Sequence, residues 1–137
     1  MGKTFTIRAN WMSAGISKKR WIFLDDERNP SSVLWSNHVY RRLGDWDYEV
    51  IVCRDMNAVL DALKNYKIEH MSFDHDLGLV DENGDEITGY TILKKLIEMH
   101  SGGELSNLPT CSFHSRNPIG VENMRSYYEN YLKLLEL

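Results

Sequence analysis

The sequence predicts an α/β domain in which a mainly parallel sheet of about four strands lies between helices on its two faces. Short apolar runs alternate with longer amphipathic segments through most of the chain. The first two of these runs, residues 21–24 and 50–53, are continuous, which is typical of parallel strands that are buried on both faces. Right-handed crossovers join such strands, so their carboxyl ends meet at one edge of the sheet, where ligands bind.

Two strand–helix units are expected in the first half of this domain. Residues 21–24 and 49–53 are apolar runs that favour buried strands. Asp55 is a residue type that caps helix N-termini, and residues 56–66 carry apolar side chains at helical spacing. Residues 33–43, between the two strands, are also expected to be helical.

The second half repeats the pattern. Residues 69–73 and 110–114 are predicted strands, and the polar residues within 79–87 predict a hairpin tip. Thr88 and Asn117 are expected to cap the two remaining helices, the second of which has proline at its first position. The expected inner stripe of the last helix is Val121, Met124, Tyr128, Tyr131 and Leu135.

The N-terminal residues differ from this pattern. Residues 3–9 alternate polar and apolar side chains, which predicts a short strand or one arm of a hairpin, and a linker follows. We therefore divide the chain into an N-terminal extension, residues 1–19, and an α/β domain, residues 20–137.

Composition limits the function classes. The chain has 137 residues, of which 42% are hydrophobic and 26% are charged, as in an ordinary globular domain. No stretch approaches the ~18 uninterrupted apolar residues of a membrane span, so no membrane association is expected. The net charge of −4 argues against duplex DNA as a partner. Cys53 and Cys111 lie in predicted buried strands and are expected to be reduced, as in the cytoplasm.

Carboxylates follow two of the predicted strands. Asp25 and Asp26 end the first strand, and Asp74 and Asp76 follow the third. Carboxylates that share one edge repel one another unless a proton or a cation neutralises them. Mg²⁺ prefers such oxygen ligands, and Mn²⁺ is the alternative. We expect a metal site formed by Asp25, Asp26 and Asp74. Asp76 is the alternative to Asp74, which lies closer to its strand.

Two histidines lie at the same edge. His75 stands between two acids, and His114 ends the fourth predicted strand. Imidazole has a pKa near neutrality, so the pair is expected to act as general base and general acid. The alternative is that one or both only hydrogen-bond the loop backbone. Arg28 and Asp76 are expected to be auxiliary to this site.

The start of the last helix is a candidate phosphate site. Free N–H groups at a helix N-terminus bind anions, and a hydroxyl and a guanidinium nearby add donors. The alternative is an ordinary Asn-Pro helix start. The residues expected to bind phosphate are Ser115, Arg116, Asn117 and Gly120.

Three motifs together resemble a known family. They are Leu-Asp-Asp-Glu-Arg-Asn-Pro at 24–30, Phe-Asp-His-Asp-Leu-Gly at 73–78 and His-Ser-Arg-Asn-Pro-Ile-Gly at 114–120. In this order they resemble the cyclic-phosphate-processing receiver domains, divergent relatives of response-regulator receivers found in bacteria and phages. The resemblance implies a receiver, or flavodoxin-like, fold. The sequence departs from ordinary receivers, because the expected pattern has no fifth strand unit and no lysine after it. It also implies a bacterial or phage-infected cell as the location, and Asp74 matches the phosphoryl-accepting Asp of receivers.

The resemblance and the strand-end residues together predict a phosphoesterase that acts on cyclic phosphates. The substrate is expected to be a cyclic nucleotide or an RNA end that carries a 2′,3′-cyclic phosphate. The alternative is a non-catalytic receiver-like module that binds or sequesters a nucleotide or a protein partner.

Overall fold

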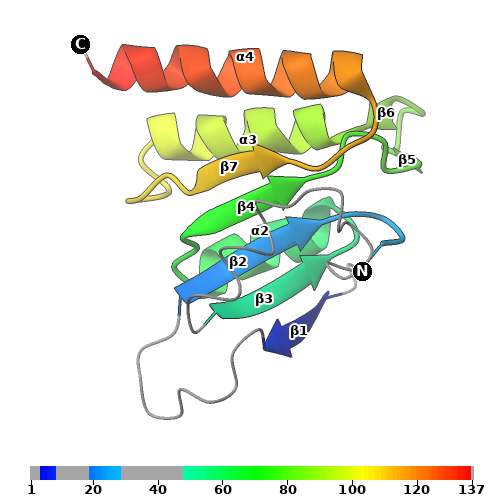
Figure 1. Cartoon of the computed structure of the whole chain (residues 1–137), viewed down its shortest axis with the longest axis horizontal. Helices are drawn as coiled ribbons and strands as arrows, with labels where there is room; N and C mark the ends of the chain where they lie inside the picture. Colours follow the sequence, from blue (N-terminus) through cyan, green and yellow to red (C-terminus); the bar gives the residue numbers. More distant parts are fainter. Residues whose placement is uncertain (1–3, 9–18, 29–47, 137) are drawn as a thin grey trace.

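The computed structural model describes residues 4–8, 19–28 and 48–136 (Figure 1). These residues contain a five-stranded sheet with the order β1-β3-β2-β4-β7. Strands β3, β2, β4 and β7 are parallel, and β1 pairs antiparallel with β3 at one edge. The predicted mainly parallel sheet and N-terminal strand are therefore confirmed. The strands are β1 (Thr4–Arg8), β2 (Lys19–Leu24), β3 (Tyr48–Cys53), β4 (His70–Phe73) and β7 (Thr110–Phe113).

Three helices follow β3, β4 and β7, and each begins at the cap that the sequence predicts. They are α2 (Met56–Asn65), α3 (Gly89–Ser101) and α4 (Pro118–Leu135). The Asp55 side chain accepts from the Ala58 N–H, Thr88 forms a capping box, and Asn117 accepts from the Gly120 N–H. The helix predicted for residues 33–43 lies outside the described residues.

The described helices share one core with one face of the sheet. Ile51, Ile22 and Met71 lie side by side across β3, β2 and β4 and are buried beneath α2 and α3. Met124 and Tyr128 of α4 join the same core, as predicted. Each fully buried apolar side chain of this size contributes ~1.5–3 kcal/mol, so this layer is the main stabilising element.

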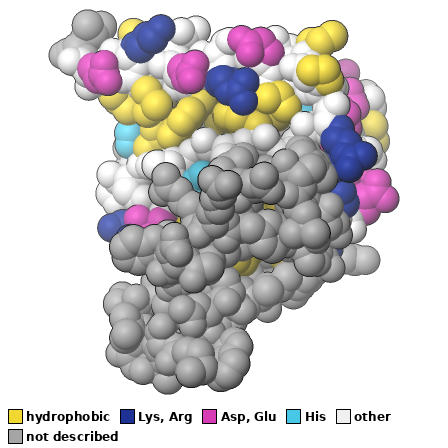
Figure 2. Space-filling model, in the orientation of Figure 1, with side chains coloured by type: hydrophobic (Ala, Val, Ile, Leu, Met, Phe, Trp, Pro, Cys, Tyr) yellow, Lys and Arg dark blue, Asp and Glu magenta, His cyan; other side chains and the backbone are white. Residues whose placement is uncertain are grey.

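The prediction is wrong for the last residue of the α4 stripe. Leu135 is 50% exposed. The reason is that α4 continues past the end of α3, so its last turn extends beyond the helix against which α4 packs (Figure 1). Charged side chains lie along the outer side of α4, and hydrophobic ones lie between α4 and the sheet (Figure 2). No helix in the described part of the chain is long and apolar enough to cross a membrane.

A small hairpin connects β4 to α3. Its strands are β5 (Leu79–Val80) and β6 (Glu86–Ile87), which pair antiparallel around the predicted tip. Asp81 holds the turn, because its carboxylate accepts from the N–H groups of Asn83 and Asp85. Gly84 has a φ of 84°, a value that glycine adopts without strain.

The second face of the sheet is also buried, but it mixes apolar and polar side chains. Trp21 and Phe23 of β2 are 4% and 2% exposed on this face. Ser72 and His114 are buried on the same side. Buried polar side chains need hydrogen-bond partners. On this face the hydrogen bonds join Ser72, His114 and Asp25, the last of which directly follows β2.

Candidate functional site

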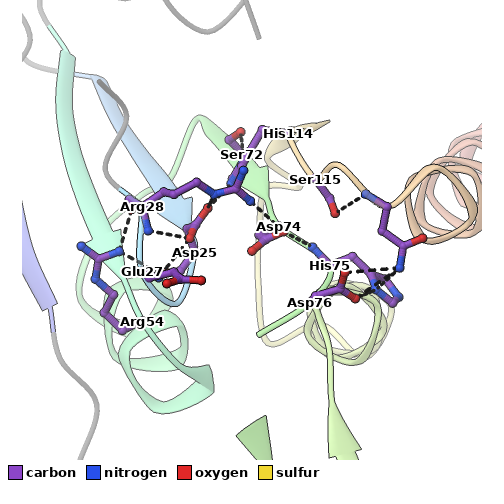
Figure 3. Close-up of polar contacts among 11 residues, drawn as sticks. Asp25, Glu27, Arg28, Arg54, Ser72, Asp74, His75, Asp76, His114 and Ser115 are labelled. Atoms are coloured by element: carbon purple, nitrogen blue, oxygen red, sulfur yellow. Dashed lines mark hydrogen bonds and ion pairs between the residues drawn. The ribbon is translucent and has the colours of Figure 1, made fainter. Parts of the chain in front are cut away.

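The ends of β2, β4 and β7 bring together residues that are far apart in the sequence. The Asp74 N–H donates to the Leu24 carbonyl at 2.9 Å, and the His114 N–H donates to the Phe73 carbonyl at 2.9 Å. The parallel ladders therefore continue one step past each strand. This register places the residues after the three strands side by side (Figure 3).

Three carboxylates converge at this edge. Asp25, Asp26 and Asp74 each place an oxygen within 4.8 Å of the other two, and we refer to them as the carboxylate cluster. Burial raises the pKa of Asp74, and the charge of Asp25 raises it further. Burial and the charges of Asp25 and Asp74 likewise raise the pKa of Asp26. Three crowded carboxylate oxygens fit the donor set of a hard divalent cation.

Asp25 is the fixed member of this cluster. Its side chain is fully buried, and four donors reach it. Its Oδ1 accepts from the N–H groups of Glu27 at 3.0 Å and Arg28 at 2.8 Å. Its Oδ2 accepts from the Arg28 Nε and lies 3.0 Å from the His114 Nε2. Burial alone would raise the pKa of Asp25, but these bonds outweigh burial and lower it.

The His114 side chain is buried on the second face of the sheet, next to Asp25. Its side chain is 0% exposed, and its ring stacks on Phe23 with centroids 4.3 Å apart. Its Nδ1 lies 2.7 Å from the Ser72 hydroxyl. Since Asp25 is ionised, the Nε2 of His114 donates to it and the Nδ1 accepts from Ser72. Both of its nitrogens are thus bonded within the protein, which favours a positioning role for His114 over the predicted role as general acid or base; its catalytic role stays a prediction.

Two arginines hold the loop after β2. The Arg28 guanidinium reaches both Asp25 and Asp74, with its Nη2 3.3 Å from the Asp74 Oδ1. Arg54, directly after β3, donates to the main-chain carbonyls of Asp25 at 3.1 Å and Arg28 at 2.6 Å. Sequence reasoning missed Arg54 and Ser72. Their signals were a charged residue immediately after a buried strand and a hydroxyl inside an otherwise apolar run.

His75 belongs to a second, more open group of residues. Its Nδ1 lies 2.8 Å from the Asp76 Oδ1, and the Asn117 amide donates to the same oxygen at 3.2 Å. The hydrogen bond with His75, followed by that with Asn117, lowers the pKa of Asp76 although burial opposes the shift. The His75 side chain is 17% exposed. Asp74 lies between this group and His114 (Figure 3).

Two glycines allow the backbone to pack closely around His75. A Cβ at Gly120 would lie 2.4 Å from the His75 Cγ, so the ring rests directly on the first turn of α4. A Cβ at Gly89 would lie 1.9 Å from the Asp74 carbonyl oxygen, and the Gly89 N–H donates to the His75 carbonyl at 2.8 Å. Helices α3 and α4 thus fix the position of His75 from two sides.

The start of α4 uses several of its donors internally. The Asn117 N–H donates to the Ser115 hydroxyl at 3.1 Å, and the Gly120 N–H donates to the Asn117 side chain at 3.0 Å. Ser115 is buried, whereas Arg116 is exposed. Phosphate binding by these four residues stays a prediction, and it would require the two N–H groups to be shared with the ligand.

The fold and the strand-end cluster define a receiver-like α/β domain with three carboxylates at the carboxyl edge of its sheet. Residues 20–130 match the family model of the Cyclic-phosphate processing Receiver domain. The chain therefore belongs to this family, as the three sequence motifs indicated. Comparisons with curated proteins and with solved structures gave no match.

Proposed function

We propose that this protein is a phosphoesterase that opens cyclic phosphates by hydrolysis. The substrate class is a cyclic nucleotide or an RNA end with a 2′,3′-cyclic phosphate. The observation that carries the proposal is the position of the His75–Asp76 pair beside the carboxylate cluster, at the ligand-binding edge of the sheet. The family description, which names cyclic-phosphate processing, supports the same reaction class.

His75 is the general base in this proposal. The lowered pKa of Asp76 keeps its carboxylate ionised, so the carboxylate accepts a hydrogen bond from the Nδ1–H of His75. The Nε2 of His75 then carries a lone pair that can take a proton from water. The water oxygen bonds to phosphorus, one phosphorus–oxygen bond of the ring breaks, and the leaving oxygen takes up the proton that His75 has accepted from the water. The ring opens to a phosphomonoester.

The carboxylate cluster would hold Mg²⁺ or Mn²⁺. When bound, such an ion supplies positive charge to the phosphoryl oxygens and lowers the pKa of bound water. Asp25, Asp26 and Asp74 would be its protein ligands. His114, Ser72, Arg54 and the main-chain N–H of Arg28 would keep Asp25 in place, while Asn117 holds Asp76 against His75.

Product analysis by chromatography tests the proposal. The protein would be incubated with 2′,3′- and 3′,5′-cyclic nucleotides and with an RNA that ends in a cyclic phosphate. Each reaction is run with Mg²⁺, with Mn²⁺ and with a chelator, beside His75→Ala. We expect ring opening by the wild type that His75→Ala loses.

Two outcomes contradict hydrolysis. Intact ligand recovered from the denatured protein, without product, would favour sequestration of a nucleotide. A phosphorylated protein after incubation with acetyl phosphate, lost in Asp74→Asn, would favour phosphoryl acceptance as in ordinary receivers. Intact mass measurement distinguishes the second outcome from the first.

A further inference from the structure

The carboxylate cluster already contains a cation, the guanidinium of Arg28. Its Nε lies 3.0 Å from the Asp25 Oδ2, and its Nη2 lies 3.3 Å from the Asp74 Oδ1. The guanidinium therefore bridges the ends of β2 and β4, the two strands whose carboxylates the cluster joins. It contacts two of the three carboxylates that a divalent ion would use.

This bridge meets an electrostatic need of the folded protein. Asp25 and Asp74 are 0% and 3% exposed, so water screens their repulsion poorly. A guanidinium that bonds to both carboxylates offsets part of this repulsion through charge-assisted hydrogen bonds. Since one positive charge faces three carboxylates, the cluster keeps a net negative charge and still attracts a cation.

The backbone and the side chain of Arg28 are held in different ways. The main chain is fixed, because its N–H donates to Asp25 and its carbonyl accepts from Arg54. The guanidinium, in contrast, reaches the carboxylates at the end of a long side chain that is 26% exposed. It can leave the carboxylates while the loop after β2 keeps its conformation.

We infer that Arg28 is the resident counter-ion of the carboxylate cluster, and that a divalent metal ion and the Arg28 guanidinium compete for Asp25 and Asp74. The inference rests on the metal site of the proposed function. Metal entry then releases the guanidinium at the mouth of the site, where it meets the anionic phosphate of a substrate. Arg28 would thereby couple metal binding to phosphate binding.

Mn²⁺ binding to the full chain, measured by isothermal titration calorimetry in a phosphate-free buffer, tests this competition. Arg28→Ala and Arg28→Gln remove the competing charge, and we expect each to bind Mn²⁺ about tenfold tighter or more than the wild type does. Arg28→Lys keeps a charge and should stay near the wild type. Thermal melting by circular dichroism checks that each variant is folded, and Arg28→Gln retains an amide that can hydrogen-bond Asp25.

Arg20→Ala is the matched control. Arg20 lies at the start of β2, where its Nε pairs with Glu49 at 3.2 Å, so this variant loses the same charge away from the cluster. Its Mn²⁺ affinity should stay within about twofold of the wild type. A second readout is the Nε–Hε NMR signal of Arg28, which should shift on addition of Mg²⁺ to the wild type.

Equal or weaker Mn²⁺ binding by both Arg28→Ala and Arg28→Gln would overturn the competition and leave the metal site intact. The absence of Mn²⁺ binding in every variant would overturn both the competition and the metal site. Hydrolysis of a cyclic phosphate in the presence of chelator, assayed on the same preparations, would then show whether the phosphoesterase proposal survives without a metal.

Discussion

The two histidines at the strand ends lie in opposite environments. His114 is fully buried, stacks on Phe23 and uses both ring nitrogens within the protein. His75 is partly exposed and, among the described residues, hydrogen-bonds to Asp76 through its Nδ1. An imidazole with both nitrogens bonded in the interior stabilises the arrangement of its neighbours. An imidazole with one nitrogen bonded to a carboxylate can exchange a proton through the other.

The largest expected effect is the loss of activity in His75→Ala, which separates a catalytic role of His75 from a structural one. His75→Ala should lower turnover of a cyclic phosphate by roughly 10²–10⁴-fold, because it removes the general base. The free energy of unfolding of this variant should change by less than about 1.5 kcal/mol, since the His75 side chain is partly exposed and packs against the outside of α4. Initial rates and urea unfolding of the same preparation measure both quantities. An active His75→Ala would remove His75 from the chemistry.

The matched substitution at His114 should act mainly on stability. His114→Ala leaves a cavity beside Phe23 and removes a partner from both Asp25 and Ser72, so we expect a loss of about 3 kcal/mol. Urea unfolding followed by circular dichroism measures it. A loss no larger than that of His75→Ala would contradict a structural role for this buried network.

A substitution at Gly120 in α4 tests whether the position of the His75 ring matters for activity. A methyl group at Gly120 would overlap the His75 ring, so Gly120→Ala should displace the imidazole and lower turnover by about 10–100-fold. Gly102→Ala is the control, because its Cβ would meet the Glu98 carbonyl oxygen at 3.1 Å, far from His75. Comparable activities of the two variants would mean that the ring position is not limiting.

The smallest expected effect concerns Asp74 and its pH dependence. Burial and the charge of Asp25 raise the pKa of Asp74 in the folded state, so the folded protein binds this proton more tightly than the unfolded chain. Ionisation of Asp74 therefore costs stability as pH rises through its raised pKa. Asp74→Asn should be more stable than the wild type at pH 7, by up to about 1 kcal/mol.

This gain should vanish below the ordinary carboxyl pKa, where Asp74 is protonated in both states. Urea midpoints of the two proteins at pH 7 and near pH 3.5 measure the difference. A variant that is less stable at pH 7 would show that the ion pair with Arg28 outweighs burial.

The sequence by itself determined the order of the described strands and helices along the chain and where those helices start. Continuous apolar runs mark β2 and β3, and shorter apolar runs that each include a serine mark β4 and β7. Asp55, Thr88 and Asn117 mark the helix caps. These features depend on local backbone propensities and on hydrophobic periodicity, which a single sequence displays. Because parallel strands present their carboxyl ends at one edge, the carboxylates after β2 and β4 could be assigned to one site.

Only the tertiary structure decided what each of those residues touches. The strand order places β4 between β2 and β7, which brings Asp25, Ser72 and His114 together across 89 residues of sequence separation. The burial of His114, the support from Arg54 and the contact between Gly120 and His75 follow from that register and from helix packing. Such contacts are set by the three-dimensional arrangement of distant segments, which no local sequence pattern encodes.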